Sequence, residues 1–439
     1  MDDEFFANSS SRGKERMASP EQRRQEVEKL LNTDASSESG DTNTVAAAGA
    51  SMMSEKVSSL TSDKASDVPW WNRRQKKWTN DDPRAVSLAE ELLALAREVT
   101  PSDEQLKERD IFLDKLQQVV AGQVEGAMVT PFGSVVNGFW TPSSDIDICL
   151  QVPGVGTRNS QIKVLRKVAN ELHKLSSHFI EPRFGAKIPI IHWAPRRPGM
   201  LACDISVNNI MAIVNSRLIG RYTEIDPRMH TLGMAIKYWA KARGINDRSR
   251  GTLSSFSLIS CLVHFLQRRP VPVLPSLQDL AFTKNHPPVY INGFDCRYAT
   301  DADEIAEELA YQRGDKDPSD ENVGYLLHEF FQYYAYQYKF GVISIRDCVS
   351  FTRKMDDESC YFFVDNPFEV GKDVANVVVS QYSRIRQEFR RAQALLSQGV
   401  SFMDMCSTNH NAPKTGASAA SEGARSILGT LPSNEQFFK

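Results

Sequence analysis

The sequence predicts an α+β protein in which a small mixed-sheet segment precedes a mainly helical one. Between residues 127 and 207, short runs alternate apolar and polar side chains with the period of half-buried strands. After Asp226-Pro227, longer segments instead repeat apolar side chains at helical spacing. The chain has 439 residues, which is enough for two domains and additional segments.

Five strands and one helix are expected in the first segment. The strands are predicted near 127–131, 145–151, 178–182, 187–193 and 201–207, and the helix over 159–175. Helices in the second segment are predicted at 227–242, 252–267, 323–339 and 373–397. Residues 270–322, which are rich in Pro and acidic side chains, are interpreted as a connection.

Two helices are expected before the sheet segment. Asp82 can cap a helix whose first position is Pro83, and a second helix is predicted from Pro101-Ser102 to about Val120. Residues 1–80 are interpreted as mostly disordered, because few large apolar side chains offset the entropy of ordering.

The other chain end and the border of the ordered part need separate interpretation. Residues 401–439 have the composition of a disordered tail. At the opposite border, Trp70, Trp71 and Trp78 alternate with cationic residues. They are interpreted either as an RNA-docking arm or, more simply, as anchors of the tail on the folded body.

Composition excludes several classes of protein. The formal net charge of −3 and the pI of about 6.3 exclude a globally basic nucleic-acid binder. Seven cysteines without a CxxC pair argue against a zinc module and a disulfide framework. No apolar run approaches a membrane span, and the start MDDEFF resembles neither a signal nor a transit peptide. We therefore expect an intracellular protein, cytoplasmic or nuclear, that is not secreted and does not enter a membrane.

The stretch FGSVVNGFWTPSSDIDICL, residues 132–150, carries the strongest chemical signal. Gly133 and Ser134 can cradle a phosphate, with a helix beginning there to aim its amides at the anion. Asp145 and Asp147 share one face of a predicted strand, and Asp204 lies in another apolar-flanked strand. Three such carboxylates can hold two divalent cations for phosphoryl or nucleotidyl transfer, and Mg²⁺ is the usual ion.

Two further groups of residues can bind a nucleotide. Lys237 and Lys241 share a face of a predicted helix, where they either meet phosphates or form a solvated basic face. Ser255 and Phe256 open the next helix. The serine can bind phosphate and the ring can stack on a base, although an isolated Phe is more often part of a core.

In their order, these motifs resemble one enzyme family. FGS and DID are followed by CDISVNN, KYWAK, GTLSSFSL, VLPSLQ, VGYLLHEFFQYYA and DNPFEVGKDVA. The chain resembles terminal uridylyltransferases and non-canonical poly(A) polymerases of the DNA polymerase beta superfamily over about 85–398. The resemblance implies a two-lobed enzyme with the nucleotide between the lobes. It assigns 126–222 to the catalytic domain, 223–400 to the helical central domain, and 81–125 to helices packed on the helical lobe.

The resemblance also implies roles for individual residues. Asp145, Asp147 and Asp204 match the catalytic metal ligands, with Asp204 nearest the RNA 3′-hydroxyl. Asn215 matches a ribose contact and Phe256 a stacking position. The remaining nucleotide-binding positions match Gly133, Ser134, Ser216, Lys237, Lys241, Ser255, Asn366, Glu369 and Lys372.

Three departures from the family pattern affect the choice of base. Phe256 replaces the usual Tyr, Asn366 replaces a common Asp, and Lys372 replaces a His of many uridylyl-transferring members. Lysine only donates hydrogen bonds, so Lys372 suits the O4 acceptor of uracil and opposes the amino group of adenine. Glu369 could serve either base, Asn366 can both donate and accept, and Glu369 and Lys372 could also simply pair with each other.

We therefore expect a template-independent RNA 3′-terminal nucleotidyltransferase that adds UMP from UTP with two Mg²⁺ or Mn²⁺ ions and releases pyrophosphate. The alternatives are a poly(A) polymerase that uses ATP, a small-molecule nucleotidyltransferase, and an inactive RNA-binding relative. The expected partners are the nucleotide and a single-stranded RNA 3′ end. A protein partner could select the RNA, because the sequence has no separate RNA-binding module.

Overall fold

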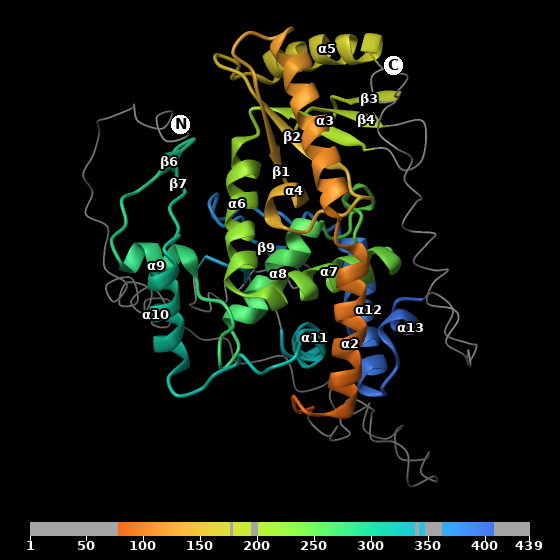
Figure 1. Cartoon of the computed structure of the whole chain (residues 1–439), viewed down its shortest axis with the longest axis vertical. Helices are drawn as coiled ribbons and strands as arrows, with labels where there is room; N and C mark the ends of the chain where they lie inside the picture. Colours follow the sequence, from red (N-terminus) through yellow and green to blue (C-terminus); the bar gives the residue numbers. More distant parts are fainter. Residues whose placement is uncertain (1–77, 176–178, 195–200, 339–341, 347–361, 408–439) are drawn as a thin grey trace, which may run out of the picture. The chain divides into compact units, whose positions relative to one another are not determined.

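The computed structural model describes residues 78–175, 179–194, 201–338, 342–346 and 362–407. Figure 1 shows one mixed sheet with flanking helices and a larger helical part. The predicted α+β class is confirmed. The helices are α2 (Pro83–Val99), α3 (Asp103–Ala121), α4 (Ser134–Asn137), α5 (Arg158–Leu175), α6 (Ile210–Ile225), α7 (Pro227–Ala242), α8 (Ser255–Gln267), α9 (Leu277–Thr283), α10 (Ala302–Arg313), α11 (Val323–Gln332), α12 (Val379–Ser397) and α13 (Phe402–Cys406). Short helical turns cover Arg248–Arg250 and Tyr333–Gln337.

The main sheet has five strands in the order β1-β2-β5-β4-β3. The strands are β1 (Met128–Phe132), β2 (Ile146–Gln151), β3 (Phe179–Arg183), β4 (Ile190–Ala194) and β5 (Cys203–Val207). Only β2 and β5 pair in parallel, whereas the other neighbours are antiparallel. All five strands lie within three residues of their predicted bounds. Two smaller sheets pair β6 (Tyr290–Ile291) with β7 (Phe294–Asp295) and β8 (Val342–Ile343) with β9 (Phe363–Val364).

Two buried clusters of apolar side chains define two lobes. The sheet lobe is built on the main sheet, with Trp193 fully buried at its centre. The helical lobe is larger, and its core includes Trp239 of α7, Phe330 and Phe331 of α11, and Phe389 of α12. Aromatic rings in this core meet edge to face, as Trp239 does with Phe331 at a centroid distance of 4.7 Å. Such contacts stabilise the core beyond simple area burial.

Local caps explain where two helices of the helical lobe begin. The Asp82 carboxylate accepts from the backbone N–H of Arg84 at 3.0 Å, and Pro83 holds the first helical position of α2, as predicted. The same Asp-Pro pattern starts α7, where Asp226 accepts from the N–H of Arg228 at 2.9 Å. Both aspartates also pair with their arginines, so they act as structural groups.

The expectation that both N-terminal helices pack on the helical lobe is wrong for α3. Helix α2 does pack there, against α7 and α11. Helix α3 instead buries Phe112, Leu116 and Val120 in the core of the sheet lobe, where Phe112 stacks on Trp193. A few residues between the helices therefore carry the chain from one lobe to the other, so the 81–125 segment is shared by both lobes.

Helix α6 was not predicted. It spans the expected boundary between the catalytic domain (126–222) and the helical central domain (223–400). Its buried residues Val214, Leu218, Ile219 and Tyr222 belong to the core of the helical lobe, although α6 also packs on α4 and β1. The helix is therefore a structural bridge rather than the last element of the catalytic domain. The helix opens with five consecutive apolar residues, 210–214, and this run hides the helical period.

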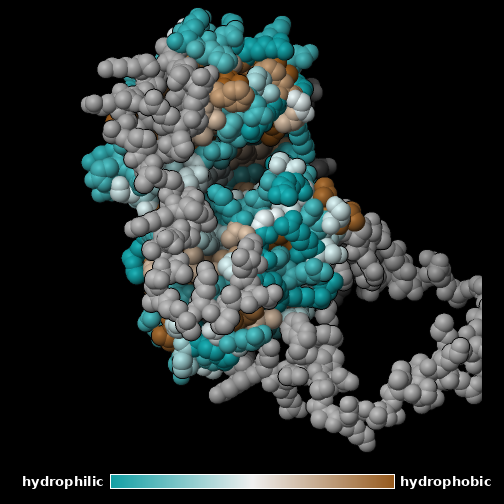
Figure 2. All heavy atoms as spheres, turned by 90° about the vertical axis from the view of Figure 1, so that its right-hand side faces the viewer, coloured by the Kyte–Doolittle hydropathy of each residue, from teal (hydrophilic) through white to brown (hydrophobic). Residues whose placement is uncertain are grey.

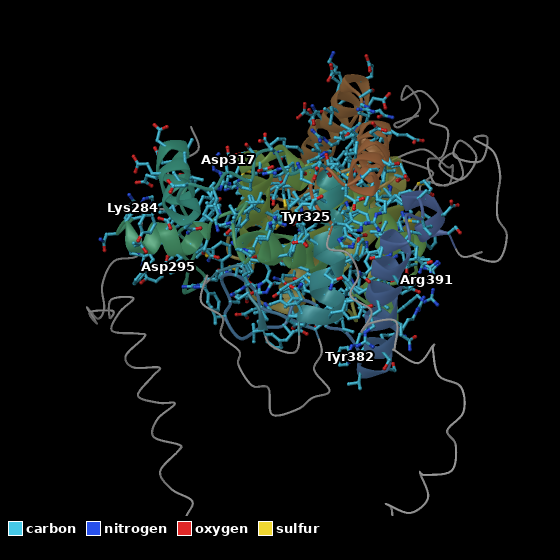
Figure 3. The ribbon with its side chains drawn as sticks, turned by 90° about the horizontal axis from the view of Figure 1, so that it is seen from below. Lys284, Asp295, Asp317, Tyr325, Tyr382 and Arg391 are labelled. Carbon is cyan, nitrogen blue, oxygen red and sulfur yellow. The ribbon has the colours of Figure 1, made fainter. Side chains whose placement is uncertain are left out.

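The interpretation of 270–322 as a mere connection is also wrong. The segment contains α9, α10 and the β6–β7 hairpin. Asp301 in this segment has a structural role, because its carboxylate caps α10 by accepting from the backbone N–H groups of Asp303 and Glu304. Lys284 after α9 lies 3.7 Å from the carboxylate of Glu307 in α10, and Figure 3 labels Lys284 and Asp295 in this region.

The chain ends are ordered further than expected. Helix α13 lies inside the predicted tail 401–439, and Phe402, Met405 and Cys406 are buried. Arg391 of α12, labelled in Figure 3, donates to the carbonyl of Met405 at 2.8 Å. The tail prediction is therefore wrong for the first residues, while 408–439 lie outside the described residues.

At the other end, the description begins at Trp78, which is buried and stacks on His328 with ring centroids 4.0 Å apart. This contact supports the anchoring interpretation for Trp78. Trp70, Trp71 and the rest of 1–77 lie outside the described residues.

Among the described residues, no helix combines the length and the apolar character that crossing a membrane requires. The face visible in Figure 2 is mainly hydrophilic, with apolar side chains in small separate patches.

The contact between α2 and α11 gives a stability prediction. A Cβ added to Gly324 would lie 2.1 Å from the carbonyl oxygen of Ala85 and 2.7 Å from the N–H nitrogen of Ala89. Gly324→Ala should therefore destabilise the protein by about 1–3 kcal/mol, since backbone atoms cannot move aside cheaply. Thermal melting measures the effect against Gly156→Ala, whose added Cβ meets nothing within 4 Å. Equal melting temperatures for the two variants would contradict this packing.

Candidate active site

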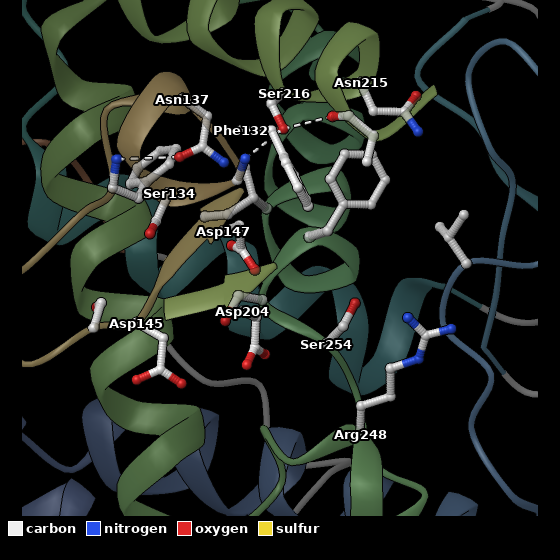
Figure 4. Close-up of a pocket in the computed structure, with 18 of the residues that line it drawn as sticks. Phe132, Ser134, Asn137, Asp145, Asp147, Asp204, Asn215, Ser216, Arg248 and Ser254 are labelled. Atoms are coloured by element: carbon white, nitrogen blue, oxygen red, sulfur yellow. Dashed lines mark hydrogen bonds between the residues drawn. The ribbon is translucent and has the colours of Figure 1, made fainter. Parts of the chain in front are cut away.

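The middle of the main sheet brings together the aspartates predicted as catalytic. The parallel register of β2 and β5 sets Asp147 directly opposite Asp204. Asp145 comes just before β2, and Figure 4 shows the three carboxylates facing one open space. Opposed residues of neighbouring strands point to the same face of a sheet, which explains the convergence of Asp147 and Asp204.

Gly133 is required by the position of Asp147. The residue follows β1, where Phe132 is in register with Asp147, and its φ is +65°. A Cβ at Gly133 would lie 2.1 Å from Oδ2 of Asp147. Both the left-handed backbone and the close approach therefore exclude a side chain here.

The predicted phosphate-binding helix is only one turn long. Helix α4 contains Ser134–Asn137, so its dipole is small and the expected helix effect is largely absent. The corner is instead fixed by Ser216 of α6, whose Oγ accepts from the Gly133 N–H at 2.7 Å and donates to the carbonyl of Ala212 at 2.7 Å. Ser216 therefore holds the Gly133 backbone in place.

Burial and mutual repulsion perturb the carboxylates. Burial, together with the charges of Asp204 and Asp145, raises the pKa of Asp147 to about 7, and the charge of Lys237 opposes this rise. Burial also raises the pKa of Asp145, again assisted by Asp204. A carboxylate surrounded in this way is stabilised by a bound cation.

The opposite wall of the site carries the two lysines of α7. Lys237 donates from Nζ to the carbonyl of Phe139 at 2.6 Å. Burial, together with the neighbouring charge of Lys241, lowers the pKa of Lys237 to about 8. The helical spacing of these lysines thus directs both into the cleft, which disfavours the alternative of a solvated basic face.

Helices α6 and α8 add polar and aromatic groups. The side-chain carbonyl oxygen of Asn215 is buried and has no hydrogen-bond partner among the described residues. Ser255 is exposed and shares hydrogen bonds with Asn246, while Phe256 is half-buried with one part packed on the helical core. Phe256 therefore combines both roles considered from the sequence, since it packs on a core and also lines the cleft.

The loop after β9 carries the three residues expected at the base edge. Lys372 Nζ lies 2.5 Å from Oε2 of Glu369, which also accepts from Nδ2 of Asn366 at 3.1 Å. The Glu369–Lys372 pair considered from the sequence is therefore formed. Asn366 Oδ1 accepts from the backbone N–H groups of Phe368 and Glu369, so this oxygen is committed to the loop.

One cleft of about 960 Å³ collects all of these groups. It is lined from the sheet lobe by the three aspartates and from the helical lobe by the lysines, Phe256 and the base-edge loop. Every residue predicted from the sequence lines it: Gly133, Ser134, Asp145, Asp147, Asp204, Asn215, Ser216, Lys237, Lys241, Ser255, Phe256, Asn366, Glu369 and Lys372. Residues more than 200 positions apart thus meet in a single site.

Sequence reasoning missed His192. No histidine was among the candidate site residues, but Nδ1 of His192 lies 2.6 Å from Oδ1 of Asp204. The antiparallel register of β4 and β5 sets the two residues opposite each other. Pairing the predicted strands 187–193 and 201–207 as a hairpin brings His192 near Asp204, but only the register of the folded sheet sets the two residues opposite each other.

The donor set fits a hard divalent cation. Asp145, His192 and Asp204 each offer one ligand atom within 4.8 Å of the others. Asp147 adds a third carboxylate on the side of Lys237. Carboxylate oxygens are the ligands that Mg²⁺ prefers, and Mn²⁺ also accepts imidazole nitrogen.

Comparisons with known proteins agree with this geometry. A family model described as the central palm domain of mitochondrial-like poly(A) RNA polymerase matches residues 88–224. Poly(A) RNA polymerase cid11 of Schizosaccharomyces pombe is 27% identical over 335 residues, which are 73% of this chain and 65% of that protein. Poly(A) RNA polymerase GLD2-B of Xenopus laevis is 30% identical over 320 residues, or 70% of this chain and 60% of that protein. Terminal uridylyltransferase 7 of Homo sapiens is 30% identical over 272 residues, which are 61% of this chain and 18% of that protein.

Solved structures of the Cid1 poly(U) polymerase share the fold. The MgGTP-bound form has a TM-score of 0.62 and 26% identity, covering 73% of this chain and 98% of that chain. The complex with the UTP analog UMPNPP has a TM-score of 0.61 and 25% identity, covering 74% of this chain and 99% of that chain. The chain spans between 18% and 65% of the length of the three curated relatives above. In sequence, fold and cleft, the chain is therefore similar to non-canonical poly(A) polymerases and terminal uridylyltransferases.

Proposed function

We propose that this protein is a template-independent RNA 3′-terminal nucleotidyltransferase that adds UMP from UTP and releases pyrophosphate. The observation that carries the proposal is the opposition of acidic and basic groups across one cleft. Asp145, Asp147 and Asp204 converge on one wall, and Lys237 and Lys241 line the other. A nucleoside triphosphate and its cations need this combination of charges.

The aspartates would hold two Mg²⁺ or Mn²⁺ ions, and Gly133 makes room for the Asp147 carboxylate. Such ions neutralise charge on the triphosphate and make a hydroxyl more nucleophilic. Asp204 is the residue proposed to lie nearest the RNA 3′-hydroxyl. Lys237 and Lys241, with Ser134 and Ser255, would orient the triphosphate through charge and hydrogen bonds.

The proposed nucleoside pocket lies on the helical side of the cleft. The unpartnered carbonyl oxygen of Asn215 can accept a hydrogen bond from a ribose hydroxyl, which favours NTP over dNTP. The ring of Phe256 offers a stacking surface for the base. Ser216 would act indirectly by holding the Gly133 corner.

The preference for UTP rests on the base-edge loop. Oε2 of Glu369 already accepts hydrogen bonds from Lys372 and Asn366. The N–H groups of Lys372 and Asn366 that do not bind Glu369 are therefore the main hydrogen-bond donors available to a base. Donors suit the O4 acceptor of uracil and oppose the N6 amino group of adenine. ATP is the alternative substrate, because cid11 and GLD2-B are named as poly(A) polymerases. The 3′ end of a single-stranded RNA is the proposed acceptor, and a protein partner could select it.

Extension of a labelled single-stranded RNA with each NTP separately tests the activity. UTP should give the longest products, and Asp204→Asn should lower the rate by about 10²–10³-fold, because several kcal/mol of charge stabilisation are lost. The exposed Asp114→Asn on α3 is the matched control. Consumption of NTP without RNA would identify a small-molecule transferase, and no turnover with Mg²⁺ or Mn²⁺ would favour an inactive relative.

Lys372→Met tests the choice of base. Loss of the charged donor should reduce the ratio of UTP to ATP incorporation up to about tenfold, the value of one hydrogen bond to a charged group at a partly exposed position. Kinetics with UTP and ATP at matched concentrations measure this ratio. Lys284→Met is the control, since Lys284 pairs with α10 and does not line the cleft. An unchanged ratio would show that Lys372 only supports Glu369.

Magnesium should stabilise the protein more at about pH 8 than at about pH 6, because ligand carboxylates must be ionised. The pKa of Asp147 in the fold, about 7, exceeds its ordinary value of 3.8. Without a cation, the stability that this group contributes is complete below the ordinary value and is lost as the pH rises through about 7. Melting curves with and without Mg²⁺ at both pH values measure the difference. Asp147→Asn should remove most of it, and an equal Mg²⁺ effect at both pH values in the unmutated protein would contradict the prediction.

A further inference from the structure

His192 is in direct contact with the carboxylate that would lie nearest the reacting hydroxyl. Its Nδ1 lies 2.6 Å from Oδ1 of Asp204, and the antiparallel register of β4 and β5 aligns the two residues. Only 15% of the His192 side chain and 26% of the Asp204 side chain are exposed. Two neighbouring strands therefore hold this contact in a partly buried position.

The chemistry of the pair fixes which atom donates. An ionised carboxylate can only accept hydrogen bonds, so the proton lies on Nδ1 of His192. Oδ1 of Asp204 is then engaged by the imidazole, and Oδ2 remains for another partner. A carboxylate bound at one oxygen has lost the rotation that would otherwise exchange its two oxygens.

The other two aspartates are controlled differently. Asp147 fills the space that Gly133 leaves open and faces the charge of Lys237. Asp145 lies just before β2, outside the strand pairing that aligns Asp147 with Asp204. Asp204 thus has its own orienting group, provided from a separate strand.

We propose that His192 is a positioning residue that fixes Asp204 through the Nδ1–H···Oδ1 hydrogen bond and so presents Oδ2 to a divalent cation. The proposal rests on the proposed function, because it assumes that Asp204 binds a cation. Groups that orient a metal ligand in this way typically change metal affinity by about 10- to 100-fold.

Direct ligation is the competing arrangement. The His192 nitrogen lies within 4.8 Å of the ligand oxygens of Asp145 and Asp204, close enough to share one ion with them. Ligation through Nδ1 would require the nitrogen to lose its proton and break the observed hydrogen bond. The two arrangements predict different spectra with Mn²⁺, since only a bound nitrogen gives strong coupling to the electron spin.

The experiment compares Mn²⁺ binding by the full chain and its variants, using the electron paramagnetic resonance signal of free Mn²⁺. His192→Leu removes the donor, whereas the amide nitrogen of His192→Asn can take the place of Nδ1. We expect His192→Leu to bind Mn²⁺ about 10- to 100-fold more weakly and His192→Asn to stay within about threefold of the unmutated protein. The exposed His173→Leu on α5 should bind Mn²⁺ normally. Electron spin echo measurements on the unmutated protein should show no directly bound ¹⁴N, and melting curves verify that each variant folds.

Several results would overturn the proposal. Unchanged Mn²⁺ affinity in His192→Leu, or equal weakening in both His192 variants, would exclude positioning by a hydrogen-bond donor. A strong ¹⁴N coupling that disappears in His192→Leu would make His192 a ligand instead. If the unmutated protein extends RNA while His192→Leu binds Mn²⁺ normally, the proposed function stands and this inference fails. If the unmutated protein binds no Mn²⁺, both the proposed function and the positioning role of His192 are contradicted.

Discussion

Repulsion between converging carboxylates is the constraint on which the rest of this structure depends. Asp147 and Asp204 are opposed across two parallel strands, and Asp145 lies just before one of them. Burial in low dielectric makes such a group of charges costly without a cation. The fold meets that cost with a glycine that leaves space beside Asp147, a histidine that holds Asp204 and a lysine on the facing helix. Each of these three residues lies next to one of the carboxylates, and this position accounts for its residue type.

Much of the sheet lobe could be predicted from the sequence, because alternation of apolar and polar residues is a local signal. It located all five strands, and the spacing of Asp145 and Asp147 indicated a shared face. The Asp-Pro pairs located the starts of α2 and α7. The residues that line the cleft from the helical lobe came largely from the family resemblance, since residues such as Asn366 and Lys372 have no local pattern that indicates a nucleotide.

The misses have a common physical origin in tertiary contacts. Helix α6 packs against both lobes and opens with an uninterrupted apolar run, 210–214, so its helical period is weak. The sequence of α3 does not indicate which of the two cores the helix packs on. The stacking of Phe112 on Trp193 in the structure shows that α3 packs on the core of the sheet lobe. The His192–Asp204 contact depends on strand pairing across twelve residues of sequence. The α13 tail segment is ordered by groups on distant helices, including Glu91, which accepts from the Phe402 N–H at 2.7 Å.

The path of the chain between the two cores has a mechanical consequence. In the described part of the chain, the backbone leads from one core to the other in the link 100–102 between α2 and α3 and along α6, and Phe139, between α4 and β2, also reaches the core of the helical lobe. A movement of one lobe relative to the other must therefore bend the backbone at 100–102 and at or beside α6. Any such movement would also change the distance between the aspartates on one wall of the cleft and Lys237 and Lys241 on the other.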